Sequence, residues 1–511
     1  MTAEEAPLNR QSVGSGWIYP AVAAVAVAVY VGALANRFAV DDIPLIVQNP
    51  LVSSGSGLWR AFVTPYWPAD LGGSLYRPLP VASWALDRLV DGAVWYHLVN
   101  LLWHAAVSIA VAALARRVAG EPTGLAAGLL FAVHPVHVEA VANVVGRAEL
   151  MAGLFVVLAV HAALARQSVG WSAAAWGLGL LCKENAAVLP ALVVWGWMVG
   201  LARPTRRRMA TFVASWVVIG GTYTAIRWAV LHPYAEFHSL APIFLGEPPA
   251  VVRWTAVAAL ADVARLLVFP LTLRVDYSPA ERSAIPSPLN PWLAAGLACL
   301  ILWGALLAFT WRRGRRIETY GLGWIGIAFL PVANLLFPVG FLLAERTLYL
   351  PSVGFALAAG AWLARLPRGV LRPTAAALVV LCAVRTGLRV PVWRDNTSVT
   401  LSILEDSPHS YVGPKRMISA YLDLHEPGKA LAAARGAAAI YDRDPTIYDT
   451  GAVAAFAANE PLVADTMLAQ LERMCRRCVG YYHRESATAR RHGYLAAADS
   501  LLARARALDT P

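Results

Sequence analysis

The sequence predicts an all-α protein that crosses a membrane many times and ends in a smaller helical domain. Of its 511 residues, 58% are apolar and 15% are charged, and its mean hydropathy is +0.53. Soluble proteins are about 45–50% apolar and about 25% charged, so this chain carries too little charge to cover several soluble domains. Aromatic residues make up 10% of the chain and it has only 5 cysteines. This composition excludes disorder and a disulfide-stabilised scaffold.

Apolar stretches predict about eleven transmembrane helices, each of which needs about 20 mostly apolar residues. The stretches are 17–35, 95–115, 123–135, 147–165, 171–182, 186–202, 209–231, 291–311, 320–340, 348–364 and 373–390. A cleaved signal peptide is the alternative for the first stretch. The segment before it carries Glu4 and Glu5 beside a single Arg10, which is a poor match to a basic leader.

The positions of the basic residues predict the orientation, because Lys and Arg gather in cytoplasmic loops. With the N-terminus inside, every arginine cluster falls inside, provided that the apolar segment 253–271 does not cross. That segment carries Arg253, Asp262 and Arg265, which are costly at the bilayer centre. We therefore expect a helix on the outer membrane surface and a C-terminus outside. The net charge of +11 and the pI of about 9.6 then reflect topology and give no support to nucleic-acid binding.

The character of the chain changes near residue 393, so we expect a membrane domain at 1–392 and a helical domain at 393–511. The membrane domain would have two long outer loops, about 36–94 and about 232–290. In the tail, GKALAAARGAAAIYDRDP and GYLAAADSLLARARALDTP start 65 residues apart, at 428 and 493. They resemble the second helix of a tetratricopeptide repeat, whose period is about 34 residues, and 459–478 is a weaker copy. An unrelated helical bundle is the alternative.

The remaining ionisable residues gather at the predicted outer ends of the spans, where their cost usually marks function. Asp41 and Asp42 open the first outer loop and could serve as a general base or as metal ligands; a solvated loop start or helix cap is the alternative. Cations at this face suit a lipid phosphate, which arginine can bind with two parallel hydrogen bonds. The other residues in such positions are Arg77, His97, His104, His134, His137, Glu139, Arg147, Glu149, Lys183, Glu184, Glu345 and Arg346.

Histidine and cysteine spacing gives little support to a metal site. His134 and His137 could share a helix face and bind zinc, but Pro135 lies between them and spacing fixes no third ligand. We expect a hydrogen-bonding or substrate role for both. Cys475 and Cys478 form a single CxxC pair, which is too few for a zinc ribbon, and the sequence leaves their redox state open. The other three cysteines lie in predicted spans and are expected to pack there.

In their order along the chain, these motifs resemble the transmembrane and tetratricopeptide-repeat-containing (TMTC) O-mannosyltransferases. The resemblance covers nearly the whole chain. The matching stretches are AVDDIPLIVQNP, LYRPLP, HLVNLLWHAAVS, FAVHPVHVEAVANVVGRAELMA, LLCKEN, LTLRVDYSPAERSAIP, AERTLYLPSVGF and WRDN.

The resemblance implies a GT-C glycosyltransferase that uses a polyprenyl-phosphate-linked sugar at the outer, or lumenal, face. The expected donor is dolichyl-phosphate mannose and the expected acceptor is a Ser or Thr hydroxyl of a protein. Asp41 and Asp42 match the acidic pair of the family's first outer loop. This chain has far fewer repeats than better-known members, which leaves the acceptor open. Its Ala- and Arg-rich composition indicates a bacterial source, in which case the carrier would be undecaprenyl-based.

For such a donor we expect one of Asp41 and Asp42 to act as the base. Phosphate is already a good leaving group, and single displacement would invert the β-linked sugar to an α-linkage. No cofactor is expected, and a divalent metal is an alternative that we do not favour, because there is no diphosphate to clamp. The repeats would hold the acceptor protein on a concave surface. Arg346, Arg147, Lys183 and Arg77 would offset the phosphate charge, supported by His97, His134, His137, Glu139, Glu149, Glu184 and Glu345.

Three other functions stay open. A non-enzymatic membrane scaffold would use the repeats to bind partners and would not need polar residues at the outer ends of its spans. A transporter or flippase would often show inverted repeats or broken helices near the midplane; no internal repeat is seen among the spans, and the charges lie at one interface rather than mid-membrane. A GT-C enzyme with another sugar, or with a glycan or lipid acceptor, is the third. The repeats favour a protein acceptor only by analogy.

Overall fold

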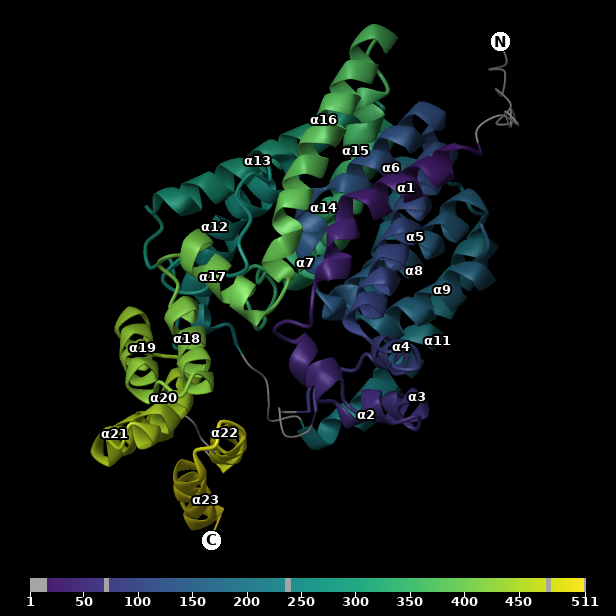
Figure 1. The fold of residues 1–511 in the computed structure, drawn as a ribbon. Helices are drawn as coiled ribbons and strands as arrows, with labels where there is room; N and C mark the ends of the chain where they lie inside the picture. Colours follow the sequence, from purple (N-terminus) through teal and green to yellow (C-terminus); the bar gives the residue numbers. More distant parts are fainter. Residues whose placement is uncertain (1–15, 69–72, 235–239, 475–478, 510–511) are drawn as a thin grey trace, which may run out of the picture.

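The computed structural model describes residues 16–68, 73–234, 240–474 and 479–509. Within these ranges the chain is helical and contains no β-strand, which confirms the all-α prediction (Figure 1). The predicted CxxC pair, Cys475 and Cys478, lies outside the described residues.

Most predicted membrane stretches coincide with one main helix. The helices before residue 393 are α1 (Ile18–Tyr30), α2 (Pro50–Ser53), α3 (Gly57–Arg60), α4 (Pro78–Asp87), α5 (Ala93–Ala119), α6 (Glu121–Val133), α7 (Val138–Ala142), α8 (Arg147–Ala165), α9 (Val169–Cys182), α10 (Leu189–Val199), α11 (Arg206–Leu231), α12 (Pro249–Val268), α13 (Pro291–Arg312), α14 (Arg316–Phe329), α15 (Tyr349–Leu363) and α16 (Arg368–Arg389).

Several helices are long and apolar enough to cross a membrane, as in an integral membrane protein. They do not determine the number of spans. Among the described residues, 6 helices are long and apolar enough to cross a membrane, or up to 7 if the bent pair Glu121–Val133 and Pro135–Ala142 forms one span. The helices α9, α10, α14 and α15 have 14, 11, 14 and 15 residues. The total of eleven spans therefore stays a prediction. Helix α12, which we expected not to cross, is not among the 6.

The arginine-rich loops share one end of the bundle. They are joined there by Arg116 Nη1 to Tyr19 Oη at 3.2 Å, Arg208 Nη1 to the Gln167 side chain at 2.9 Å, Arg316 Nη1 to the Gly200 carbonyl at 3.4 Å and Arg365 Nε to Glu318 at 2.6 Å. Helix α1 starts at this end and runs to the opposite one, where the loop with Asp41 begins (Figure 1). The arginine-rich loops and the loop with Asp41 thus lie at opposite ends of the bundle, and the side of the membrane that each faces stays a prediction.

Helix α15 packs very closely against its neighbours at glycines. A Cβ on Gly354 would lie 2.4 Å from the Gly321 carbonyl oxygen of α14, and a Cβ on Gly360 would lie 2.8 Å from the Ala127 backbone nitrogen of α6. Small residues let membrane helices approach in this way. This packing holds the start of α15, which follows Arg346, in the middle of the bundle.

After residue 393 the chain forms one helix and then three helix pairs. They are α17 (Asn396–Asp406), the pair α18 (Val412–Asp423) and α19 (Pro427–Ile440), the pair α20 (Pro445–Ala457) and α21 (Pro461–Met474), and the pair α22 (Val479–Arg491) and α23 (Leu495–Asp509). The three segments expected to be second helices correspond to α19, α21 and α23. Their assignment as tetratricopeptide repeats stays a prediction.

The helical domain has its own core, but α17 does not belong to it. Tyr411 and the apolar residues after it form one buried cluster. In contrast, Val399 and Ile403 of α17 are buried in the same cluster as Tyr349 of α15. Helix α17 is therefore packed as part of the membrane bundle and carries the helical domain at its end. The division of the chain into two domains at residue 393 stays a prediction.

Candidate active site

Asp42 ties the first outer loop to the loop before α8. Its Oδ2 accepts from the backbone N–H of Ala39 at 3.1 Å and of Val144 at 3.4 Å, and its Oδ1 accepts from that of Val145 at 2.8 Å. The side chain is fully buried. Burial raises the pKa of Asp42 to about 7, against the effect of these three bonds. Asp42 thus has its oxygens occupied by backbone and holds the loop in place.

Asp41 differs from its neighbour, because its side chain is only partly buried. Within the described part of the chain, its carboxylate takes part in no hydrogen bond or ion pair. Burial raises its pKa above the ordinary value, and Arg346 and Arg416 oppose that rise. A carboxylate with free oxygens and a raised pKa is suited to accept a proton.

Arg346, at the start of α15, interacts electrostatically with Asp41. It belongs to a short 3₁₀-helix, η11 (Glu345–Leu348). Its backbone N–H donates to Glu139 Oε2 at 2.8 Å, and its Nη1 forms an ion pair with Glu139 Oε1. Glu139 raises the pKa of Arg346. The Arg346 side chain is 33% exposed, so its guanidinium is oriented by Glu139 while part of it remains open to a ligand.

Two further ion pairs continue the same cluster. Arg77, which precedes α4, donates from Nε to Glu184 Oε2 at 2.9 Å and from Nη2 to Oε1 at 2.5 Å. Lys183 pairs with Glu149 of α8, which also accepts from Asn185 Nδ2 at 2.9 Å. Electrostatic interactions link Lys183 with Arg77 and Arg346, and Arg77 and Arg346 with Asp41. Arg77 and Arg346, from separate loops, therefore act on the Asp41 carboxylate, and Lys183 interacts with these two arginines.

Arg147 lies apart from this opening. Its side chain is fully buried. It forms an ion pair with Asp87 and donates to Asn100 Oδ1 at 2.8 Å and to the Tyr96 carbonyl at 2.9 Å. Because each of its terminal nitrogens is used inside the protein, Arg147 is placed to join α4, α5 and α8, and we do not include it in the donor site.

The predicted histidines are buried within the helix bundle. His97 Nε2 lies 3.2 Å from the Arg37 carbonyl, His134 Nε2 lies 3.0 Å from the Leu267 carbonyl, and His137 Nε2 lies 2.6 Å from Ser352 Oγ. His104 lies 2.9 Å from Tyr349 Oη. These contacts hold loops and helices together. No group of three or more His, Cys, Asp or Glu side chains in the described ranges is placed to hold a metal ion.

The Glu345 carboxylate is bonded to the second long loop, at Arg274 and Tyr277. Its Oε1 accepts from the Arg274 backbone N–H at 2.6 Å and from Tyr277 Oη at 2.9 Å. The side chain is 3% exposed, and burial raises its pKa to about 7 against the effect of Arg389. Glu345 therefore fixes the second loop beside the site.

The raised pKa of Glu345 predicts a pH-dependent stability. Because the folded protein favours the protonated form, this stabilisation is present at low pH and is lost as pH rises through about 7. Glu345→Gln keeps an oxygen for both donors and removes the charge. We expect its Tm in detergent to match the wild type at pH 5 and to exceed it at pH 8.

The control for this measurement is Glu426→Gln, in the exposed pair that Glu426 forms with Lys429 at 2.7 Å. It should change Tm little at either pH, because exposed pairs contribute little to stability. A Glu345→Gln shift of equal size at pH 5 and pH 8 would contradict the assignment.

Several residues of this cluster were not identified from the sequence. Asp87, Asn100 and Tyr349 are the partners of predicted site residues, and their bonds are recognisable only once α4, α5 and α15 are packed. Arg416 of α18 was also missed. The quoted WRDN and AERTLYLPSVGF stretches contain Asn396 and Tyr349, but spacing gave no signal for their roles.

Comparison with known proteins shows which family this chain is similar to. Residues 84–228 match the family model described as dolichyl-phosphate-mannose-protein mannosyltransferase. Human protein O-mannosyl-transferase TMTC4 is 28% identical over 478 residues, which cover 77% of this chain and 62% of that protein. The chain is a relative of the TMTC O-mannosyltransferases. Mouse TMTC3 is 28% identical, with 66% of this chain and 41% of that protein covered.

The resemblance expected from the motifs is therefore confirmed, and it extends to invertebrates. The Caenorhabditis elegans protein O-mannosyl-transferase F38B6.6 is 28% identical over 341 residues, 64% of this chain and 48% of that protein. The chain thus spans about three-fifths of the length of human TMTC4 and less of the other two TMTC relatives. No solved structure matches the chain. A bacterial source stays a prediction.

Proposed function

We propose that this protein is a membrane mannosyltransferase that moves mannose from a polyprenyl-phosphate donor to a Ser or Thr hydroxyl of a protein. The observation that carries the proposal is the Asp41 carboxylate, which has no hydrogen-bond or ion-pair partner among the described residues and interacts with the cations Arg346 and Arg77. Lys183 interacts with both arginines. A base beside a cluster of cations suits attack on a sugar whose leaving group is an anion. The named function of the TMTC relatives supports the same chemistry.

In the proposed reaction the acceptor hydroxyl oxygen attacks the anomeric carbon of mannose. Asp41 accepts the hydroxyl proton, and the bond between the anomeric carbon and the phosphate oxygen breaks. The electron pair of that bond leaves with the lipid phosphate. Arg346 balances the charge that develops there, with Lys183 and Arg77 adding to the positive field. A single displacement inverts the anomeric centre, so the β-linked sugar would become α-linked.

A protein acceptor is favoured by the helical domain. Its three helix pairs lie on the same side as the catalytic loops (Figure 1), and stacked helix pairs form extended binding surfaces. We expect this domain to hold the acceptor chain while its hydroxyl reaches Asp41. The source of the polyprenyl carrier, dolichol or undecaprenol, does not change the chemistry at the phosphate.

The test uses the purified full-length protein in lipid nanodiscs. It is given polyprenyl-phosphate mannose and a Ser/Thr-rich unfolded protein, and in parallel polyprenyl-phosphate glucose. We expect mannosylated protein whose sugar is removed by an α-mannosidase, and little transfer from the glucose donor. The assay is repeated with and without EDTA, and transfer that survives EDTA would agree with the metal-free mechanism.

The other open functions give different results in the same assay. Transfer to lipid or glycan but not to protein would agree with the proposed transfer reaction and would contradict the proposed protein acceptor. Release of sugar from the glucose donor alone would contradict the proposal that mannose is the transferred sugar. Failure to consume any polyprenyl-phosphate sugar, with protein binding intact, would favour the scaffold.

A further inference from the structure

The catalytic loop is held by the segment that leads into the helical domain. The Arg37 backbone N–H donates to the Arg394 carbonyl at 2.7 Å, and the Val40 N–H donates to Asn396 Oδ1 at 2.7 Å. Val40 has a φ of 53°, a left-handed conformation that is unfavourable for a β-branched residue. Asn396 therefore anchors an unfavourable turn immediately before Asp41.

Arg416 of α18 reaches the same anchor from the helical domain. Its Nη2 donates to Asn396 Oδ1 at 3.4 Å, and its Nε donates to Thr400 Oγ1 at 3.1 Å. The Asn396 side-chain oxygen is thus shared between the catalytic loop and α18. Arg416 and Asp41 also interact electrostatically. One arginine outside the membrane bundle is therefore bonded to the residue that fixes the turn and is close enough to act on the base.

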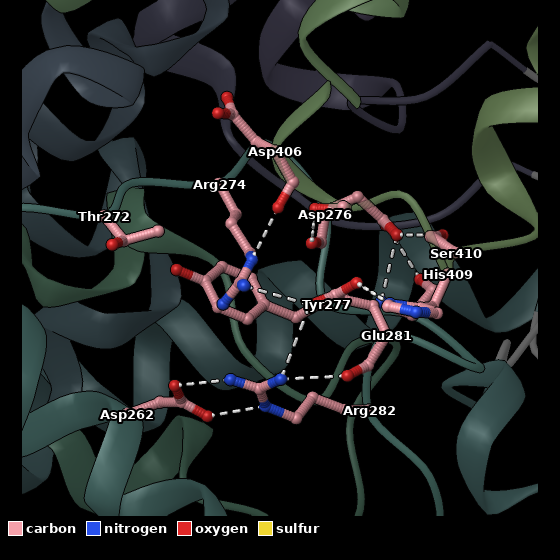
Figure 2. Close-up of polar contacts among 12 residues, drawn as sticks. Asp262, Thr272, Arg274, Asp276, Tyr277, Glu281, Arg282, Asp406, His409 and Ser410 are labelled. Carbon is pink, nitrogen blue, oxygen red and sulfur yellow. Dashed lines mark hydrogen bonds and ion pairs between the residues drawn. The ribbon is translucent and has the colours of Figure 1, made fainter. Parts of the chain in front are cut away.

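A second set of contacts fixes the start of α18 against the second outer loop (Figure 2). The Ala280 N–H donates to the His409 carbonyl at 3.1 Å, and the Tyr411 N–H donates to the Pro279 carbonyl at 2.9 Å. Arg274 Nε donates to the Asp406 carbonyl at 2.7 Å, and Ser410 Oγ donates to Asp276 Oδ2 at 2.5 Å. These bonds join the loop to the turn between α17 and α18, so α18 is held in a defined position from which Arg416 points to Asn396.

We propose that Arg416 is a positioning residue for the catalytic Asp41, acting through the shared oxygen of Asn396 and through its own charge, so that the helical domain completes the active site. This inference rests on the proposed function. It gives the helical domain a role in the chemical step, in addition to any role in holding the acceptor.

The effect of the Arg416 charge on the pKa of Asp41 can be separated from the effects of the other charged groups around Asp41. The cations that act on its carboxylate are Arg346 of η11, Arg77 before α4 and Arg416 of α18; the other groups are Glu139 of α7, the neighbouring Asp42 and the Tyr66 phenol. Arg416 in turn faces Asp41 and Asp276. Removing Arg416 takes away one cation that lowers the pKa of Asp41, so that pKa should rise. A base with a higher pKa loses its ionised form at a higher pH.

The first experiment is the pH profile of kcat/KM for mannose transfer by Arg416→Met. We expect its acidic limb to move to higher pH by about one unit, which lowers the rate on that limb about tenfold and leaves the alkaline plateau within about twofold. Arg416→Lys should restore most of the shift. The control is Arg435→Met, in an exposed pair with Glu460 on the next helix pair, and it should leave the profile unchanged.

A second variant tests the shared anchor without relying on the pH profile. Asn396→Ala should lower kcat about tenfold, because a base that is misplaced by about an ångström loses efficiency, and it should leave the donor KM unchanged. Hydrogen exchange gives a readout that needs no activity: the Val40 amide should exchange faster in Asn396→Ala and in Arg416→Met than in the wild type.

The outcomes separate this inference from the proposed function. If the wild type consumes no polyprenyl-phosphate sugar, the proposed function fails, and unchanged Val40 exchange in both variants would overturn the anchor by itself. If the wild type is active and Asp41→Asn is not, an unshifted limb in Arg416→Met overturns the role of Arg416 while the function stands. An equal loss of rate at every pH, with Val40 exchange unchanged, would mean that Arg416 serves only to hold the fold.

Discussion

Replacing Asp41 with asparagine should lower mannose transfer by about 10²–10⁴-fold, the usual contribution of a general base. Among the residues that the structure describes, the Asp41 carboxylate has no bond that holds the loop, so Asn can replace it in shape without disturbing the fold. Donor binding and Tm should therefore stay close to the wild type. The measurement is transfer to a Ser/Thr-rich protein from polyprenyl-phosphate mannose, with donor affinity measured separately on the same preparation.

Asp42→Asn is the matched control, because the two residues are adjacent and chemically identical. Asp42 accepts three backbone N–H groups. An Asn amide would place N–H donors against one of those backbone donors and cost about 1–3 kcal/mol. We expect a lower Tm for this variant and residual activity in the fraction that folds. Full activity in Asp41→Asn, or loss of activity in Asp42→Asn at unchanged Tm, would exchange the roles of the two carboxylates.

Arg346→Ala should raise the donor KM between about ten- and a hundredfold, since a hydrogen bond to a charged group contributes about 1.5–3 kcal/mol. The guanidinium is aimed by Glu139 and partly exposed beside Asp41, which is the geometry needed to bind a phosphate with two parallel hydrogen bonds. We expect kcat to fall as well, because the phosphate charge is greatest in the transition state. The measurement is initial rate against donor concentration at a saturating acceptor concentration.

The alanine variant also leaves the buried Glu139 without its partner, and that loss must be separated from the loss of phosphate binding. The double variant Glu139→Gln with Arg346→Ala removes the unpaired charge and should recover Tm while the donor KM stays high. Arg346→Lys keeps a charge but not the planar group, and it should give an intermediate KM. An unchanged donor KM in Arg346→Ala would remove this residue from the phosphate site.

The sequence predicted the all-α fold and the positions of most apolar helices, because the length of an apolar stretch is a local property. Most apolar stretches coincide with a helix, and the segment with Arg253, Asp262 and Arg265 formed α12, which is not among the helices long and apolar enough to cross. The ionisable residues at the predicted outer ends of the spans also indicated the loops that carry Asp41, Arg77, Glu184 and Arg346. The lengths of the helices were harder to predict. The chain breaks at Pro135, beside Lys183 and beside Glu345, and these breaks lie at the candidate site.

Residue roles within the site depended on contacts that spacing does not encode. Asp41 and Asp42 are equivalent in the sequence, and only the packing of the loop before α8 occupies one carboxylate and leaves the other free. Arg147 and Arg346 both appeared as phosphate ligands, yet Asp87, Asn100 and the Tyr96 carbonyl surround the first, whereas the second stays partly open.

The sequence by itself determined that this is a helical membrane protein, that many of its arginines gather in a few loops, and that its motifs resemble those of O-mannosyltransferases. These properties follow from hydropathy, charge and local order, which are read along the chain. Only the tertiary structure decided which carboxylate is free and brought Arg416 to Asn396, because such contacts join residues more than 100 positions apart or on separate helices. Burial and the direction of a hydrogen bond, which set the chemistry of each side chain, exist only after the helices have packed.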